Sequence, residues 1–125
     1  VVLTVRIGGT PVEAAKKYMP KAELRMFDDE NQAYQEVLNG NAHACVSSAP
    51  GPEFWVNRHP DTLFLPLEGD TFTKEPIGFA VRKGQQDTLT YFNNWIQYYT
   101  DTDWLHDKHM YWFVGDDWRK FLAEE

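Results

Sequence analysis

Residues 5–15 read VRIGGTPVEAA, and within them a strand pattern changes to a helix pattern. β-Branched residues alternate through Val2–Ile7, which is typical of a strand, and apolar residues recur at helical spacing after the turn. Pro11 suits the first turn of a helix, because its missing N–H needs no partner there. Thr10 is a good N-cap residue, and Glu13 three residues later resembles a capping box. The stretch therefore predicts a strand, a tight turn and a helix.

The unit of strand and helix repeats along the chain. The elements predicted next are a strand at Ala22–Phe27, a helix capped by Asp28 or Asp29 and ended by Gly40, a strand at Ala42–Ser47 and a short helix at Glu53–Arg58. Thr62–Leu67 and Ile77–Arg82 predict two further extended segments. In the second strand and the helix after it, the side chains expected to be buried are Leu24, Met26, Phe27, Ala33, Tyr34, Val37 and Leu38. Alternating strands and helices with short links indicate an α/β fold, a mostly parallel sheet flanked by helices.

Two polar turns follow strands of this predicted sheet, one at residues 8–10 and one at Ser47-Ser48. In parallel α/β sheets, ligands gather at the carboxyl ends of the strands, where the loops meet helix N-termini. Free N–H groups and the helix dipole at the start of the first helix favour an anion there. The Thr10 hydroxyl can add a hydrogen bond unless it caps the helix. A tight turn without a ligand is the alternative, and the local sequence leaves both open.

The bulk composition fits one globular domain and argues against some classes of function. The chain has 125 residues and a formal charge of −7, which argues against binding to nucleic acid and against a polybasic membrane contact. Cys45 is the single cysteine, so no intrachain disulfide exists, and a small buried hydrophobe is favoured over a nucleophile. No apolar run is long enough to span a membrane. The chain opens without a signal peptide, so we expect a processed or excised piece.

Aromatic residues are concentrated in the last third of the chain. The residues that form an apolar stripe on a predicted helix are Leu89, Phe92, Trp95, Ile96 and Tyr99, and a second helical stretch is expected at Trp104–His109. Packing on this domain, on another lobe or on another chain is favoured over stacking on a sugar. If that partner is missing, the exposed apolar surface predicts self-association. We divide the chain into an α/β ligand-binding lobe at 1–84 and an aromatic-rich helical C-terminal segment at 85–125.

The order of several short motifs resembles one protein family. The motifs are the turn at 8–10 followed by Glu13-Ala14-Ala15-Lys16-Lys17-Tyr18, the helix end Leu38-Asn39-Gly40, the strand Ala44-Cys45-Val46 and the stretch EPIGFAVRKG at residues 75–84. In this order and spacing they resemble the second lobe of the family 3 solute-binding proteins, the periplasmic receptors of polar amino acid ABC importers. The tail is similar to the helices that follow in that family.

The resemblance implies a non-catalytic receptor, periplasmic or extracellular and membrane-associated, that closes two lobes on an amino acid or related small carboxylate. One of the two lobes is missing from this sequence. A membrane ABC permease is the implied partner of the whole protein, and no cofactor, metal or nucleic acid is expected. The same bilobal modules also sense ligands in membrane signalling receptors, and dehydratase-like enzymes share the fold. Both functions are kept as alternatives.

The resemblance also assigns site residues. The expected ligand-binding residues are Gly8, Gly9, Thr10, Ser47, Ser48 and Glu75. The turn at 8–10 matches the family's turn that receives the ligand carboxylate. Ser48 stands where amino acid binders of the family commonly carry an aspartate that pairs with the ligand ammonium, and a hydroxyl cannot compensate that charge. Either the ligand is not a standard α-amino acid, or Glu53 or Glu75 supplies the missing charge.

The histidines and acidic runs carry weaker signals. His106 and His109 could share a helix face, but two ligands without a clear third and fourth favour solvated histidines over a metal site. His43, at the start of a strand, is expected to satisfy a local hydrogen bond. The acidic runs at 28–30 and 116–117 are interpreted as helix caps or solvated faces, because no loop of spaced calcium ligands follows them.

Overall fold

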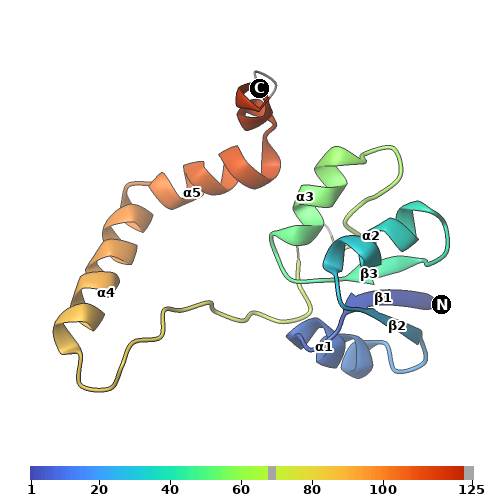
Figure 1. Ribbon diagram of the computed structural model, residues 1–125, viewed down its shortest axis with the longest axis horizontal. Helices are drawn as coiled ribbons and strands as arrows, with labels where there is room; N and C mark the ends of the chain where they lie inside the picture. Colours follow the sequence, from blue (N-terminus) through green and yellow to red (C-terminus); the bar gives the residue numbers. More distant parts are fainter. Residues whose placement is uncertain (68–69, 123–125) are drawn as a thin grey trace. The chain divides into compact units, whose positions relative to one another are not determined.

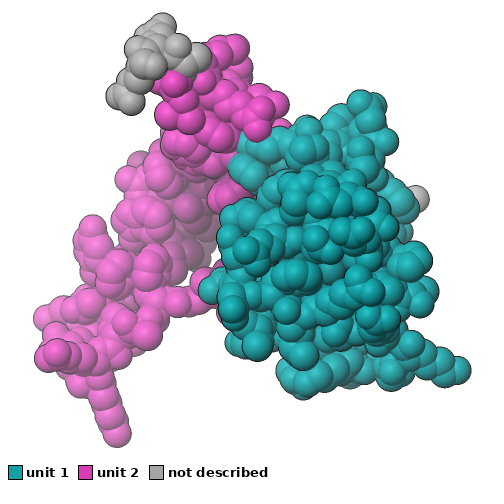
Figure 2. Space-filling view, turned by 45° about the vertical axis from the view of Figure 1, so that its right-hand side comes forward, with its two compact units in different colours: residues 1–74 teal, residues 75–125 magenta. Residues whose placement is uncertain are grey.

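The computed structural model describes residues 1–67 and 70–122. The chain divides into two compact units, unit 1 at residues 1–74 and unit 2 at residues 75–125 (Figure 2). The boundary that the sequence predicts, after Gly84, stays a prediction. Residues 123–125 of the predicted C-terminal segment lie outside the described residues.

A three-stranded parallel sheet forms the centre of unit 1 (Figure 1). Unit 1 contains the strands β1 (Val2–Arg6), β2 (Glu23–Phe27) and β3 (Ala44–Val46) and the helices α1 (Thr10–Tyr18), α2 (Glu30–Leu38) and α3 (Gly51–Arg58). The strand order is β2-β1-β3, and Leu3 of β1 lies beside Leu24 of β2 and Ala44 of β3. The α/β fold with a parallel sheet, predicted from the alternation of elements, is confirmed.

The helices α1 and α2 cover opposite faces of the sheet. Leu3 of β1 packs with Ala15 of α1 in the hydrophobic core, so α1 covers the face on which Leu3 lies. The neighbouring Thr4 is fully buried, and its Oγ1 donates a hydrogen bond of 2.8 Å to the Ala33 carbonyl of α2. Successive side chains of a strand point to opposite faces. The chain therefore winds in one direction from β1 to β2 and in the other from β2 to β3.

Buried residues concentrate around β1, the middle strand. The buried residues of unit 1 are Leu3, Thr4, Val5, Val12, Ala15, Ala33, Tyr34, Ala42 and Val46. Val5 and Thr4 are the largest side chains that are fully buried. Met26, which the strand pattern predicts to be buried, is 50% exposed, because it lies on β2, an edge strand of this sheet.

Both ends of α2 are fixed by the residues that the sequence predicts. The Asp29 carboxylate accepts a hydrogen bond of 2.9 Å from the Asn31 N–H, which makes Asp29 the N-cap. At the other end Gly40 adopts φ +76, a left-handed conformation that favours glycine. The N–H groups of Gly40 and Asn41 bond the carbonyls of Val37 and Glu36, the pattern of a Schellman motif.

The helix α3 packs against α2 through aromatic rings. The Trp55 ring stacks on the Tyr34 ring of α2, with centroids 4.9 Å apart. The ring of His59, which follows α3, stacks on the Trp55 ring, with centroids 5.5 Å apart. Because Tyr34 is buried on α2, this stack fixes where α3 begins relative to the end of β3.

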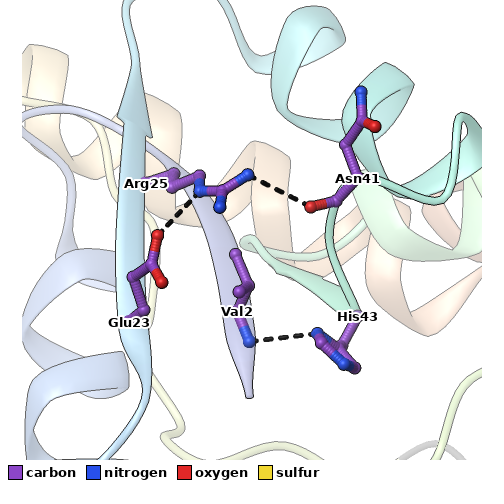
Figure 3. A network of polar contacts seen from close by, with 5 residues as sticks. All are labelled: Val2, Glu23, Arg25, Asn41 and His43. Atoms are coloured by element: carbon purple, nitrogen blue, oxygen red, sulfur yellow. Dashed lines mark hydrogen bonds and ion pairs between the residues drawn. The ribbon is translucent and has the colours of Figure 1, made fainter.

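Polar contacts join the amino-terminal ends of the three strands (Figure 3). The Val2 N–H donates to His43 Nδ1 at 3.1 Å, and the His43 N–H donates to the Val2 carbonyl at 2.9 Å. The Arg25 guanidinium donates to the Glu23 carboxylate at 2.9 Å and to the Asn41 carbonyl at 3.2 Å. The local hydrogen bond expected for His43 is thus confirmed, and this end of the sheet is occupied by its own side chains.

The two later extended segments do not join the sheet. Residues 62–67 and 77–82 form no strand in the described part of the chain, which corrects the sequence-based prediction. Their apolar side chains are exposed, with Phe64 at 77% and Ile77 at 94%. A strand needs a partner that accepts its ladder of hydrogen bonds, and a β-type composition alone does not provide one.

Unit 2 is helical, as the aromatic pattern predicts. It contains α4 (Gln86–Asp101), α5 (Trp104–His109), a π-helical turn at Met110–Val114 and a 3₁₀ helix at Asp117–Phe121. Trp95 and Tyr99 of α4 contact each other and Trp104 of α5. Among residues 75–122 no side chain reaches full burial. None of the described helices has the length and apolar character needed to cross a membrane.

Replacing the N-cap of α2 should destabilise the fold. We expect Asp29→Ala to lower the free energy of unfolding by about 1 kcal/mol, because the Asn31 N–H loses its partner. Asp28→Ala removes the same charge from the neighbouring position and should change it by less than about 0.5 kcal/mol. Urea titration followed by circular dichroism measures both; equal losses in the two variants would contradict the capping role.

Cys45 of β3 should react slowly with thiol reagents. Burial raises the pKa of its thiol to about 11, although the Thr4 hydroxyl acts in the opposite direction. Less thiolate is then present at neutral pH, so we expect reaction with dithionitrobenzoate at pH 7.5 to be at least about tenfold slower than for an ordinary cysteine. The same chain unfolded in urea is the control. A folded chain that reacts as fast as the unfolded one would refute this protection.

Candidate functional site

The carboxyl ends of β1 and β3 form the point at which the chain changes its winding direction. The two strands are neighbours, yet β1 leads into α1 on one face of the sheet. β3 leads into α3, which packs on α2 through Trp55 and Tyr34. In open parallel sheets, ligands commonly bind at the carboxyl ends of such neighbouring strands, where the following loops diverge. The two polar turns predicted from the sequence both lie at this edge.

The N-terminus of α1 presents backbone N–H groups without partners. Gly9 is the N-cap, with φ −106 and ψ 167, and no side chain caps the helix. Gly8 adopts φ +80, which turns the backbone from β1 into the helix. The N–H groups of Gly8, Gly9 and Thr10 have no hydrogen-bond partner in the described ranges 1–67 and 70–122. These amides and the helix dipole suit an anion.

The predicted capping role of Thr10 is wrong by one residue. The helix begins at Thr10 and its cap is Gly9, so the Thr10 hydroxyl forms no cap hydrogen bond. Glu13, the expected second half of a capping box, instead pairs with Lys16 at 3.4 Å. The reason is geometric, because the extended residue before the helix is the one that can cap it, and here that residue is a glycine without a side chain. The Thr10 hydroxyl is exposed and available to a ligand.

The two serines after β3 differ in their surroundings. Ser47 is half-buried, and its hydroxyl donates a hydrogen bond to the carboxylate of Glu30 in the first turn of α2. Ser48 is exposed, and its carbonyl accepts a hydrogen bond of 3.1 Å from the Gly51 N–H. The edge thus holds five of the six predicted site residues. The sixth, Glu75, is exposed and belongs to unit 2, and its role stays a prediction.

Three side-chain oxygens converge beside Gly51, a feature that the sequence analysis did not identify. A Cβ on Gly51 would lie 3.2 Å from Ser47 Oγ, 3.2 Å from Tyr34 Oη and 3.3 Å from Glu30 Oε1. A larger residue at this position would press against all three. We call these three side chains the oxygen cluster.

Tyr34 is the most buried member of the oxygen cluster. It is 4% exposed, and its hydroxyl has no hydrogen bond of acceptable geometry in the described part of the chain. Burial raises the pKa of the Tyr34 phenol and the Glu30 charge adds to the effect, whereas the nearby Ser47 hydroxyl lowers it. The phenol is therefore neutral at physiological pH and available for hydrogen bonding.

The sequence does contain a signal for the oxygen cluster. Glu30 and Tyr34 are four residues apart on α2, so they lie on the same helix face. The spacing of apolar residues predicts an inner face with Ala33 and Tyr34, whereas Glu30 stands in the acidic run at 28–30. Of that run, Asp29 is the cap, and Glu30 is turned toward the sheet edge by its bond to Ser47.

Metal binding finds no support in the described residues. No group of three or more histidine, cysteine, aspartate or glutamate side chains is arranged to hold an ion among residues 1–67 and 70–122.

Comparisons with known proteins show which proteins the chain is similar to. No protein-family model matches the chain. The L-cystine-binding protein TcyJ of Escherichia coli K12 is 26% identical over 112 residues, which cover 90% of this chain and 41% of that protein. The chain thus spans about two fifths of the length of the curated relatives it matches.

Solved structures agree with this similarity. An ancestral cationic amino acid solute-binding protein matches with a TM-score of 0.72 and 32% identity, over 89% of this chain and 46% of the other. An ancestral arginine-binding protein bound to glutamine matches with a TM-score of 0.65 and 28% identity, over 91% of this chain and 50% of the other. The α/β fold, its parallel sheet and these matches support the resemblance of the chain to part of a family 3 solute-binding protein.

Proposed function

We propose that the chain forms one lobe of an extracytoplasmic solute-binding protein that delivers an amino acid or related small carboxylate to an ABC importer. The observation that carries this proposal is the set of partnerless N–H groups at residues 8–10. These residues follow β1, at the end of the sheet where the segments after β1 and β3 lead to different helices. The relatives bear names of cystine-binding and amino acid-binding proteins, which supports a solute with a carboxylate.

A carboxylate at this position would receive complementary charge and geometry. Free backbone N–H groups at the start of a helix carry partial positive charge. The Thr10 hydroxyl, freed from capping, is a further donor at the same point. The exposed Ser48 hydroxyl follows β3, whose Val46 pairs with Val5 of β1, so Ser48 lies at the same end of the sheet.

The wider context of the proposal follows the relatives. A second lobe would close over the solute and exclude water, and a membrane permease would receive it. Periplasmic or extracellular location and the absence of catalysis are proposed on the same basis, since the relatives are described as binding proteins. Self-association stays a prediction, supported by exposed apolar side chains in unit 2 such as Trp112 and Phe121.

Titration with amino acids should perturb the edge of the sheet. We expect L-cystine, L-arginine or L-glutamine, added to the ¹⁵N-labelled chain, to shift the amide signals of residues 8–10 and 47–48 in a saturable manner. Affinity should be weak, because a single lobe leaves half of the solute in water. Saturable shifts confined to other residues, or no shift with any of the three, would contradict the proposal.

Removing the Thr10 hydroxyl should weaken binding without affecting the fold. In Thr10→Val the shape is retained but one donor to the carboxylate is lost, so we expect roughly threefold to tenfold weaker binding of the amino acid that binds best. Thr62→Val is the matched control, because Thr62 is exposed in the same unit and should leave affinity unchanged. The same titration measures both variants, and equal affinity for Thr10→Val and the parent chain would remove Thr10 from the site.

A further inference from the structure

Arg6 is the last residue of β1, the strand that leads into the turn before α1. Its side chain is exposed, and its guanidinium forms no ion pair or hydrogen bond with the residues that the structure describes. The other two arginines of unit 1 are engaged by the protein. Arg25 forms an ion pair of 2.9 Å, and Arg58 donates to a backbone carbonyl at 2.9 Å. The donors of Arg6 are thus left to solvent or to a ligand.

The strand places Arg6 on the α2 face of the sheet, at the carboxyl ends of the strands. Side chains two residues apart on a strand lie on the same face. Thr4 lies on the α2 face, because its hydroxyl bonds a carbonyl of that helix, and Arg6 is two residues further along. The residue between them, Val5, pairs with Val46 of β3. Arg6 therefore belongs to the same end of the sheet as the two polar turns.

The carboxylates at this end of the sheet do not neutralise Arg6 through an ion pair. The acidic run at 28–30 follows β2, the strand beside Arg6. Within it, Asp29 caps α2, and Glu30 accepts a hydrogen bond from Ser47. None of the carboxylates in the described part of the chain forms an ion pair with the guanidinium. The charge of Arg6 therefore adds to the partial positive charge at the start of α1.

A guanidinium at this position suits a second anionic group on the solute. It offers only donors, in a planar fork that matches the two oxygens of a carboxylate. Arg6 and Gly8 are two residues apart, so their Cα atoms are separated by at most about 7 Å. A small solute with two carboxylates can bridge such a distance, with one carboxylate on the free amides of residues 8–10. Hydrogen bonds between two charged groups are roughly twice as strong as those between neutral groups.

We propose that Arg6 binds a second anionic group of the solute and thereby selects an acidic amino acid or a related dicarboxylate over neutral and basic amino acids. This inference rests on the proposed function and names its solute class. It assigns Arg6 as a specificity-determining residue. The selected class differs from the cystine and the cationic amino acids that appear in the names of the relatives.

The test compares L-glutamate with L-glutamine, two solutes of similar size and shape that differ in the charge of the side chain. Titrations of the ¹⁵N-labelled chain at pH 7.5 give the dissociation constants of both. We expect L-glutamate to bind the parent chain at least about tenfold more tightly, because its second carboxylate pairs with Arg6. A parent chain that binds both equally, or that binds L-glutamine, L-arginine or L-cystine better, would overturn the inference and leave the proposed function intact.

Arg6→Gln removes the charge and keeps a polar side chain. We expect it to weaken binding of L-glutamate about tenfold and to change binding of L-glutamine less than about twofold. Arg82→Gln is the matched control, because Arg82 is also exposed and its replacement changes the net charge of the chain by the same amount. An equal loss of L-glutamate affinity in both variants would reveal a general effect of charge and would remove Arg6 from the site.

Thermal unfolding and a conservative variant separate a binding role from a structural role. Since the Arg6 side chain is exposed and unpaired in the described residues, Arg6→Gln should leave the thermal midpoint unchanged. Arg6→Lys keeps the charge but not the planar fork, so part of the preference for L-glutamate should remain. A lower midpoint in both variants, with no preference left in Arg6→Lys, would assign Arg6 to the fold and overturn the inference. If none of the four amino acids binds the parent chain, the proposed function fails, and this inference fails with it.

Discussion

The fold and its candidate site both depend on the burial of β1 between two strands and two helices. Val5 and Thr4 are neighbours in this strand, are fully buried, and face α1 and α2 respectively. The apolar face is held by packing with α1, and the polar face by the hydrogen bond from Thr4 to the Ala33 carbonyl. Both interactions fix the helices relative to the middle strand, and through it the two turns that follow β1 and β3. A change in β1 would therefore disturb the fold and the site together.

The candidate site combines backbone amides without partners and polar side chains of α2. At this edge, free amides precede α1, and a phenol and a carboxylate come from α2. The opposite edge shows the contrast, because Arg25 and His43 satisfy their neighbours there. The two ends of the same three strands thus differ in how far their polar groups are satisfied by the protein itself.

Local patterns predicted the elements well, and long-range contacts explain what they missed. Alternation of β-branched residues identified β1, and Asp29 and Gly40 marked the ends of α2, because caps and turns act within a few residues. The segments at 62–67 and 77–82 have a similar composition but no strand to pair with, which composition cannot reveal. The turn at 8–10 could be placed at the ligand edge from topology alone. The convergence on Gly51 could not, since it depends on how Trp55 of α3 stacks on Tyr34.

The stack of Tyr34, Trp55 and His59 gives the protein a natural optical probe. Trp55 is the single tryptophan of unit 1, whereas Trp95, Trp104, Trp112 and Trp118 belong to unit 2. Its indole lies directly against the tyrosine whose hydroxyl belongs to the oxygen cluster, so any shift of α3 alters the environment of the excited state. In a variant whose other tryptophans are replaced, a movement of α3 at the carboxyl ends of the strands would change the emission wavelength and lifetime of Trp55.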